Sequence, residues 1–86
     1  MFWFVYLLEC RTEQLYTGCT NDVARRVGAH NRGVASKFTR SRLPVTLVYS
    51  EKCSNRSSAL KREAQIRRMS RKEKLVLIGS VRRRGA

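Results

Sequence analysis

Residues 2–20 read FWFVYLLECRTEQLYTGCT, and this stretch decides the fold of the 86-residue chain. An aromatic and aliphatic run at 2–9 is followed by the polar stretch RTEQ and by a second short run, LYTGC, at 15–19. Two such runs separated by a few polar residues predict a β-hairpin. The first run has the length of a strand and is far shorter than the roughly 20 apolar residues of a membrane span, so no membrane contact is expected.

The residues after the hairpin predict a helix and then a loop. The segment DVARRVGAHN at 22–31 repeats small apolar residues at helical spacing. Asn21 is expected to cap its first turn, and Gly33 is expected to end it. The next residues, 32–44, are rich in Ser, Gly and Arg and close at Pro44, which predicts a basic loop.

Three further elements complete the expected order. Residues 45–51, VTLVYSE, alternate as a strand does. Ser57 is expected to cap a second helix over 58–68. The sequence SRKE at 70–73 has the pattern of a capping box and predicts a third, short helix that ends near residue 78.

The resulting order, β-β-α-β-α-α, predicts an α+β fold, an α/β sandwich in which helices flank a three-stranded sheet. We expect a mixed sheet, because the long connection through a helix makes the second and third strands candidates for a crossover. Residues 1–78 are expected to form a single domain, and residues 79–86 a basic C-terminal tail.

Composition restricts the class of protein. Lys and Arg number 19 against 6 Asp and Glu, a formal net charge of +13, which points to a polyanionic partner. Hydrophobic residues make up 42% of the chain, which excludes a disordered basic tail. The three cysteines are odd in number and widely spaced, so reduced thiols are expected. A cytoplasmic location is expected because the apolar run at 2–8 is too short for a membrane span and lacks the features of a signal peptide. With the positive charge added, we expect the protein to be nucleoid-associated.

A carboxylate lies in an unusual place on the second expected helix. On a helical wheel Glu63 falls inside the apolar arc formed by Ala59, Leu60, Ala64 and Ile66. A buried charge costs several kcal/mol unless it is compensated, roughly 3–5 kcal/mol when one partner of a buried pair is missing. Glu63 is therefore expected to pair with an arginine, to hold a metal ion, or to lie at the mouth of a cleft.

Two further pairs of side chains are candidates for chemistry. Arg26 and His30 are four residues apart and share one helix face, where an arginine can bind phosphate oxygens and an imidazole can pass a proton. A solvated basic face is the alternative. Tyr6 and Tyr16 lie on neighbouring strands and can bring their hydroxyls to one face, or can be core aromatics. Gly18 marks either a bulge or a backbone that a ligand approaches closely.

The ordered set of these motifs resembles a known family. The string VYLL around Tyr6, the string YTG at 16–18, the helix NDVARRVGAH and the later Glu63 together resemble the GIY-YIG nuclease domain, and above all its short stand-alone bacterial members. The resemblance runs from about Phe4 to Ile78. The strings HNRG, KFTR and LVYSE are also similar to the nuclease domain of a structure-specific endonuclease subunit that cuts branched DNA.

The resemblance implies a divalent-metal-dependent endonuclease that hydrolyses DNA phosphodiester bonds. Glu63 would hold one cation, Mg²⁺ or Mn²⁺, together with substrate oxygens. Tyr6 or a metal-bound hydroxide would activate water, while Tyr16 and Arg26 hold the scissile phosphate. His30 would assist the proton transfer.

Basic side chains are expected to follow a DNA backbone in a salt-sensitive, sequence-independent way, so that DNA structure selects the substrate. Phe38 and Trp3 are candidates for stacking on bases, although Trp3 lies in a strand and is more typical of a core. Two alternatives stay open: a non-catalytic domain that binds DNA or RNA, and a nuclease subunit that needs a protein partner. The expected nucleic-acid contacts are Gly18, Arg25, Arg32, Lys37, Arg40, Arg42 and Arg67.

Overall fold

The structure, a computed structural model, describes residues 2–85, and for residues 81–85 it describes the backbone alone. Among the described residues, none of the helices combines the length and the apolar character needed to cross a membrane. The elements follow one another as β1 (Trp3–Cys10), β2 (Leu15–Thr20), α1 (Val23–Asn31), α2 (Lys37–Arg40), β3 (Val45–Cys53), α3 (Arg56–Arg68) and α4 (Arg71–Gly85).

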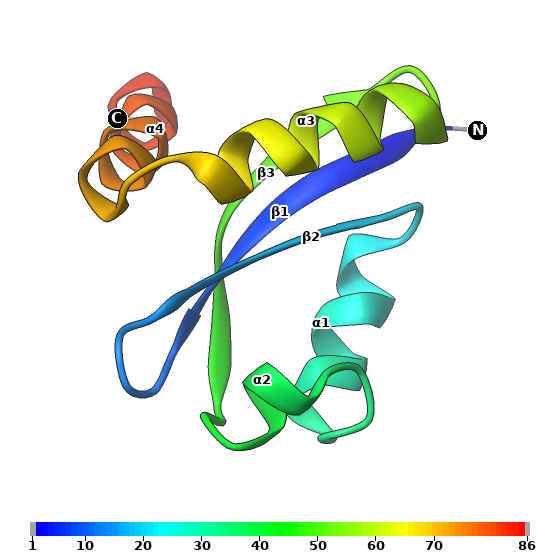
Figure 1. Cartoon of the computed structure of the whole chain (residues 1–86), viewed down its shortest axis with the longest axis vertical. Coiled ribbons are helices and arrows are strands. Elements are labelled where there is room, and N and C mark those ends of the chain that lie inside the picture. Colours follow the sequence, from blue (N-terminus) through cyan, green and yellow to red (C-terminus); the bar gives the residue numbers. More distant parts are fainter. Residues whose placement is uncertain (1, 86) are drawn as a thin grey trace.

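The three strands form one sheet in the order β2-β1-β3, and β1 pairs antiparallel with both neighbours. The expectation of a mixed sheet is therefore wrong. β2 and β3 run in the same direction, but β1 lies between them and they do not pair (Figure 1). The reason is the composition of β1, whose Val5, Leu7 and Leu8 are fully buried. A strand that is apolar throughout is most stable in the centre, where both of its faces are covered.

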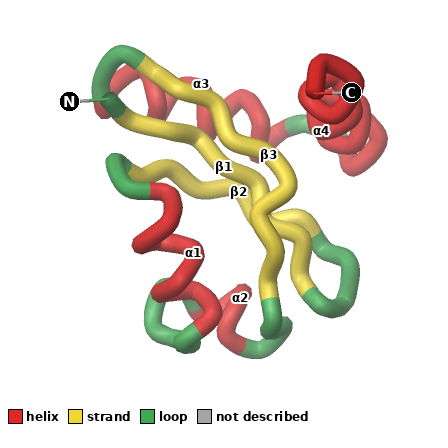
Figure 2. Tube along the Cα trace, turned by 180° about the vertical axis from the view of Figure 1, so that it is seen from behind, coloured by secondary structure: helices red, strands yellow, loops and turns green. Residues whose placement is uncertain are grey.

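Helices cover both faces of this sheet. α3 lies along one face, and α1 and α2 pack against the other, as the front and back views agree (Figures 1 and 2). On the α3 side, Val5 and Leu7 pack with Ala59 and Ile66 of the helix. On the α1 side, the buried cluster consists of Tyr6, Leu8, Cys10 and Val45. The alternation of side chains along β1 thus divides the core in two.

The ends of α1 and α3 differ slightly from the expectation. Asp22, rather than Asn21, caps α1 and accepts a hydrogen bond from the backbone N–H of Arg25 at 3.1 Å. Asn55, rather than Ser57, caps α3, because the Asn55 side chain accepts the N–H of Ser58 at 2.8 Å and so starts the helix earlier.

The predicted stop of α1 at Gly33 is confirmed. Gly33 has a φ of 77°, a left-handed conformation that glycine adopts without steric cost. Its N–H donates to the carbonyl of His30 at 2.9 Å, and the N–H of Val34 donates to the carbonyl of Ala29 at 3.1 Å. This pair of hydrogen bonds is the Schellman motif that closes many helices.

The segment predicted as a loop contains the short helix α2. Ser36 caps it by accepting the N–H of Thr39 at 3.1 Å. The end of α1 is also tied to the start of β3, because the Asn31 side chain accepts the N–H of Val45 at 2.8 Å and donates to the Val45 carbonyl at 3.1 Å. These local bonds order a Ser- and Arg-rich stretch that has few apolar residues to pack.

The C-terminal helix begins as predicted and continues further. Ser70 and Glu73 form the expected capping box, with the two backbone N–H bonds at 3.0 and 3.1 Å. α4 then runs to Gly85, so the expectation that it ends near Ile78 is wrong. Residues 79–85, which belong to the predicted basic tail at 79–86, prolong the helix, and the side chains of 81–86 lie outside the described residues.

The apolar arc of α3 is narrower than the helical wheel suggests. Ala59 and Ile66 are fully buried, but Leu60 is 45% exposed and Ala64 is exposed as well. The helix meets the sheet along one line only, so residues a quarter turn away face solvent. Arg62 lies at the margin of this line and binds the Glu51 carboxylate of β3 at 2.9 Å, which ties α3 to the edge strand.

Candidate active site

Tyr6 and Gly18 face each other in the β1–β2 pair, and the glycine makes room for the phenol. The two residues are direct partners in the register. A Cβ atom on Gly18 would overlap the hydroxyl of Tyr6, so only glycine leaves space for the ring. The close approach expected at Gly18 is therefore made by Tyr6 itself. Contact of Gly18 with nucleic acid stays a prediction.

The Tyr6 hydroxyl points at the single histidine of the chain. Its Oη lies 3.0 Å from Nε2 of His30, a residue that is only 1% exposed. The ring of Tyr16 meets the imidazole edge to face, with centroids 5.0 Å apart. On the other side of the ring, Nδ1 lies 2.8 Å from Oγ1 of Thr39. His30 is thus enclosed by one side chain from each of β1, β2 and α2.

The electrostatic environment favours neutral forms of both members of this hydrogen bond. Burial lowers the pKa of His30 below its ordinary value, and the charge of Arg26 lowers it further. Burial raises the pKa of Tyr6 well above its ordinary value, Tyr16 raises it further, and Arg26 acts in the opposite direction. At neutral pH the contact is therefore a hydrogen bond between a neutral phenol and a neutral imidazole.

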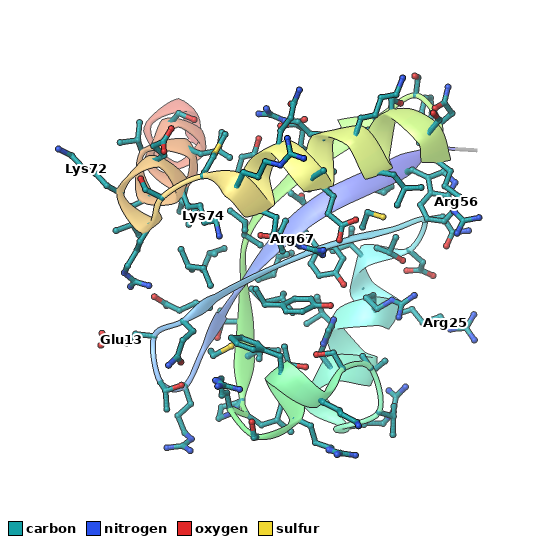
Figure 3. The ribbon with its side chains drawn as sticks, in the orientation of Figure 1. Glu13, Arg25, Arg56, Arg67, Lys72 and Lys74 are labelled. Carbon is teal, nitrogen blue, oxygen red and sulfur yellow. The ribbon has the colours of Figure 1, made fainter. Side chains whose placement is uncertain are left out.

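Arg26 lies one helical turn before His30 and is exposed. It lines an open pocket of about 540 Å³ between the end of β2 and α1. Arg25 and Arg32 line the same pocket, and Figure 3 shows Arg25 extending outward from α1. Four of the five predicted catalytic residues, Tyr6, Tyr16, Arg26 and His30, therefore gather on the α1 side of the sheet. Next to them is a basic, open surface.

Glu63 comes from the opposite side, from α3, and meets edge strand β2. Its side chain is 14% exposed, and its Oε2 lies 2.5 Å from the guanidinium of Arg67. The same Arg67 nitrogen donates to the carbonyl of Thr17 at 3.3 Å, and Figure 3 shows this side chain between α3 and β2. Of the possibilities for Glu63, pairing with an arginine is the one present here.

The edge strand brings Glu63 within electrostatic reach of the tyrosine. Glu63 is among the groups that raise the pKa of Tyr6, although the two side chains belong to opposite faces. Cys19 of β2 is partly buried and packs against the core cluster on the α3 side of the sheet. Burial, followed by the charge of Glu63, raises the pKa of Cys19 to about 11. The predicted catalytic residues thus lie around the free edge of β2.

Glu63 is a single half-buried carboxylate, and its surroundings fit a Mg²⁺ ion that takes most of its ligands from water and substrate. Among the described residues, no three His, Cys, Asp or Glu side chains cluster at metal-binding distance. Mg²⁺ is commonly held by one or two carboxylates, with water and substrate phosphate oxygens completing its shell. A half-buried carboxylate beside a basic surface fits this pattern. A site built entirely from protein ligands would need more carboxylate, histidine or cysteine side chains than are gathered among the described residues.

The remaining predicted contacts lie on α2, just after it and on α3. Lys37 and Arg40 are exposed on α2. The Arg42 guanidinium lies 3.9 Å from the centroid of the Phe38 ring. Phe38 in turn stacks on Tyr16, with centroids 6.0 Å apart, although it is 39% exposed. Phe38 therefore packs against Tyr16 of the candidate site. Because Tyr16 and Arg42 both contact its ring, neither face of the ring is fully open to a nucleic-acid base.

The other stacking candidate and the last basic contact lie elsewhere. Trp3 is half-buried beneath the guanidinium of Arg56, 5.6 Å from the ring centroid, in line with its interpretation as a core residue. Arg67 is 63% exposed, but it is engaged by Glu63.

The sequence analysis missed Thr39, which is fully buried against His30. A local signal was present, because Ser36 stands three residues before Thr39, the spacing of an N-cap and its N3 residue. That spacing indicates a helical turn inside the basic stretch, and a threonine in the first turn of a short helix can face inward. The nine-residue separation of Thr39 from His30 carried no such signal.

Comparisons with known proteins agree with this arrangement. The model of the GIY-YIG catalytic domain matches residues 2–75. A UPF0213 protein of Clostridium perfringens is 48% identical over 77 residues, which is 90% of this chain and 83% of that protein. A UPF0213 protein of Syntrophus aciditrophicus is 51% identical over 76 residues, 87% of each chain.

Two solved structures are similar as well. The solution structure of a UPF0213 protein of Bacillus halodurans is 37% identical, with a TM-score of 0.59 over 92% of this chain and 84% of that one. A protein of E. faecalis is 32% identical, with a TM-score of 0.64 over 95% and 88%. GIY-YIG domains form a nuclease superfamily whose members generally depend on a divalent metal. The chain therefore belongs to the GIY-YIG catalytic domain family.

Proposed function

We propose that this protein is a divalent-metal-dependent endonuclease that hydrolyses DNA phosphodiester bonds and selects its substrate by DNA structure rather than by base sequence. The observation that carries the proposal is the buried hydrogen bond between Tyr6 Oη and His30 Nε2, 3.0 Å long, beside the exposed charge of Arg26. A proton acceptor and an arginine at one site are what hydrolysis of a phosphodiester needs.

Tyr6 and His30 supply the proton transfer. As the water oxygen forms its bond to phosphorus, the water gives a proton to Tyr6 Oη, and the proton of Tyr6 passes to His30 Nε2. The bond from phosphorus to the leaving oxygen breaks in the same displacement, the leaving oxygen takes up a proton from solvent water, and His30 then releases its extra proton to solvent. The high pKa of Tyr6 is compatible with this path, because the phenol accepts one proton as it releases another and need not ionise first.

Arg26 and Tyr16 hold the phosphate. A guanidinium can donate two parallel hydrogen bonds to non-bridging phosphate oxygens and stabilise the charge that builds up during displacement. Arg25 and Arg32 line the same pocket and suit the neighbouring phosphates of the strand.

Glu63 would hold the Mg²⁺ or Mn²⁺, with water and substrate oxygens as the other ligands. When bound, the cation supplies positive charge that offsets the charge of the reacting phosphate. For the carboxylate to become available, the ion pair between Glu63 and Arg67 has to break. Arg67, whose side chain is 63% exposed, then leaves the Thr17 carbonyl and turns to a DNA phosphate.

Glu63→Gln tests the proposal against a non-catalytic binding domain. We would incubate labelled single-stranded, duplex, flap and four-way DNAs with wild type, with Glu63→Gln and with Glu9→Gln, in the presence of Mg²⁺ or Mn²⁺. Glu9 is an exposed carboxylate on β1, so its substitution controls for the change in net charge. The expected result is cleavage by wild type and Glu9→Gln only, with DNA binding by Glu63→Gln equal or tighter.

Binding without cleavage by all three proteins, on every DNA and with both metals, would overturn the nuclease assignment. It would favour the binding domain or a subunit that needs a partner.

A further inference from the structure

Thr39 is a polar side chain with no exposed surface, placed against the imidazole of the candidate site. It is 0% exposed, and its Oγ1 lies 2.8 Å from Nδ1 of His30. A buried hydroxyl is costly unless it is hydrogen-bonded, so this contact is a specific one. Membership of the family does not by itself assign a role to this threonine.

The hydroxyl proton of Thr39 has acceptors of its own on α2. Oγ1 lies 3.1 Å from the hydroxyl oxygen of Ser36 and 3.4 Å from the carbonyl oxygen of Ser36. Thr39 can therefore donate its proton to Ser36 and still accept a proton from the imidazole. A hydroxyl has one donor and two acceptor positions, so both bonds can form at once.

The partners of Tyr6 decide between the two neutral tautomers of His30. Among residues 2–80, whose side chains the structure describes, His30 Nε2 is the one hydrogen-bond partner of Tyr6 Oη. If Nε2 carried the proton, the buried phenol proton would have no acceptor, which costs about 1–3 kcal/mol. If Nδ1 carries the proton, Nδ1–H donates to Thr39 and Nε2 accepts from Tyr6. Only the second arrangement satisfies every buried donor in this set.

We propose that Thr39 is a positioning residue whose hydroxyl accepts the Nδ1–H of His30, fixes the imidazole in the Nδ1-protonated tautomer and so leaves Nε2 able to receive the proton of Tyr6. The catalytic part of this inference rests on the proposed nuclease function. The tautomer is a property of the resting protein.

Helix α2 therefore connects the basic surface to the proton acceptor. Thr39 holds His30, while its neighbour Phe38 stacks on Tyr16. Lys37 and Arg40 of the same four-residue helix are exposed and face the surroundings. The helix whose exposed basic side chains are predicted to contact a phosphate backbone thus also carries the hydroxyl that meets the imidazole.

Four side chains face His30 and influence its pKa. They are Tyr6 from β1, Tyr16 from β2, Thr39 from α2 and Arg26 from its own helix. Loss of the Thr39 hydroxyl would remove an acceptor for Nδ1–H of the imidazolium as well. The pKa of His30 should then fall further, and the acid limb of a pH profile should move to lower pH.

Nitrogen NMR of the imidazole is the direct test, because His30 is the one histidine of the sequence and all imidazole signals belong to it. With uniformly labelled full-length protein at neutral pH, we expect a protonated Nδ1 and an unprotonated Nε2. Thr39→Val, which keeps the shape and removes the hydroxyl, should shift the signals toward the other tautomer. Thr39→Ser should restore them.

Ser36→Ala serves as the matched control for a purely structural role. It removes the cap of α2 and one of the two acceptors of the Thr39 hydroxyl proton, but it keeps the Ser36 carbonyl as an acceptor and keeps the contact between Thr39 and His30. It should lower the stability of the protein and leave the tautomer unchanged. If wild type carries the proton on Nε2, or if Thr39→Val leaves both nitrogen shifts unchanged, the proposal is wrong.

Cleavage kinetics give the second readout. Thr39→Val should lower kcat about 10- to 100-fold, the loss typical when the group that orients a functional histidine is removed, with little change in KM. The acid limb of the pH profile of Thr39→Val should lie at lower pH than that of wild type. The two experiments distinguish failure of the nuclease proposal from failure of the positioning proposal. If wild type has a protonated Nδ1 but cuts no DNA, the nuclease function is wrong and the positioning of His30 by Thr39 still holds.

Discussion

Glu63 and Arg67, one turn apart on α3, form an ion pair in which the same arginine nitrogen also reaches the Thr17 carbonyl on edge strand β2. The arginine thus holds the carboxylate of the candidate metal ligand and fastens α3 to the edge of the sheet. A cation that binds Glu63 has to compete with this arginine.

Substitution of Arg67 by Gln should therefore strengthen metal binding. An exposed ion pair is worth about 0.2–1 kcal/mol, so Mn²⁺ should bind about 1.5- to 5-fold more tightly to Arg67→Gln than to wild type. Titration with paramagnetic Mn²⁺, followed by the broadening of amide signals around Glu63, measures this directly. Arg68→Gln removes an equal charge from an exposed position on the same helix and should change the affinity less. Equal affinities in both variants would contradict the prediction.

Gly18→Ala should disrupt the contact between Tyr6 and His30. The added Cβ overlaps the Tyr6 hydroxyl, whose ring is 2% exposed and has little room to move. Overpacking of this kind costs about 1–3 kcal/mol in the free energy of unfolding. Cleavage should fall together with stability, as followed by urea denaturation and by the DNA assay.

Gly28→Ala is the matched control for that substitution. A Cβ at Gly28 meets only the mobile end of the Arg32 side chain, at 3.3 Å. Alanine also favours a helix over glycine by up to about 1 kcal/mol. This variant should be as stable as wild type or more so. Similar losses in both glycine variants would mean that the space around Tyr6 is not what makes Gly18 necessary.

The stability of the protein should decrease as the pH falls from 7.5 to 5.5. Burial lowers the pKa of His30 in the folded state. In the unfolded state the same histidine has an ordinary pKa of about 6.5. Below that pH the unfolded state binds more protons than the folded state, so the free energy of unfolding drops. Urea denaturation at several pH values measures the slope, and His30→Gln should flatten it. A wild type that grows more stable toward pH 5.5 would show that the histidine gains, rather than loses, proton affinity on folding.

Arg25 and Arg32 should each contribute one phosphate contact. Neutralisation of either residue by Gln should reduce the slope of log K against log salt by roughly 0.9 for duplex DNA. Lys52 on β3, at the opposite edge of the sheet, provides the control, and Lys52→Gln should leave the slope unchanged. Fluorescence anisotropy of a labelled duplex at several salt concentrations gives each slope. An unaltered slope in Arg25→Gln and Arg32→Gln would remove this pocket from the DNA path.

The sequence by itself determined the hairpin and the order of the main helices and strands, whereas the register of β1 and β2 placed Tyr6 and Tyr16 on one face. The hairpin and this order depend on short-range rules. Alternation fixes the faces of a strand, and side-chain caps and glycine fix the ends of a helix, as Gly33 and the pair of Ser70 and Glu73 do.

Tertiary structure alone decided the antiparallel sheet with β1 in its centre, the burial of Thr39 against His30, and the contact of Arg67 with the Thr17 carbonyl at the edge of β2. The physical reason is that each of these depends on which apolar surfaces are covered first. β1 pairs both of its edges with the other strands, and its two apolar faces are buried because α3 packs on one side of the sheet and α1 on the other. Residues distant in sequence then meet because of where their elements pack, and no local spacing records that.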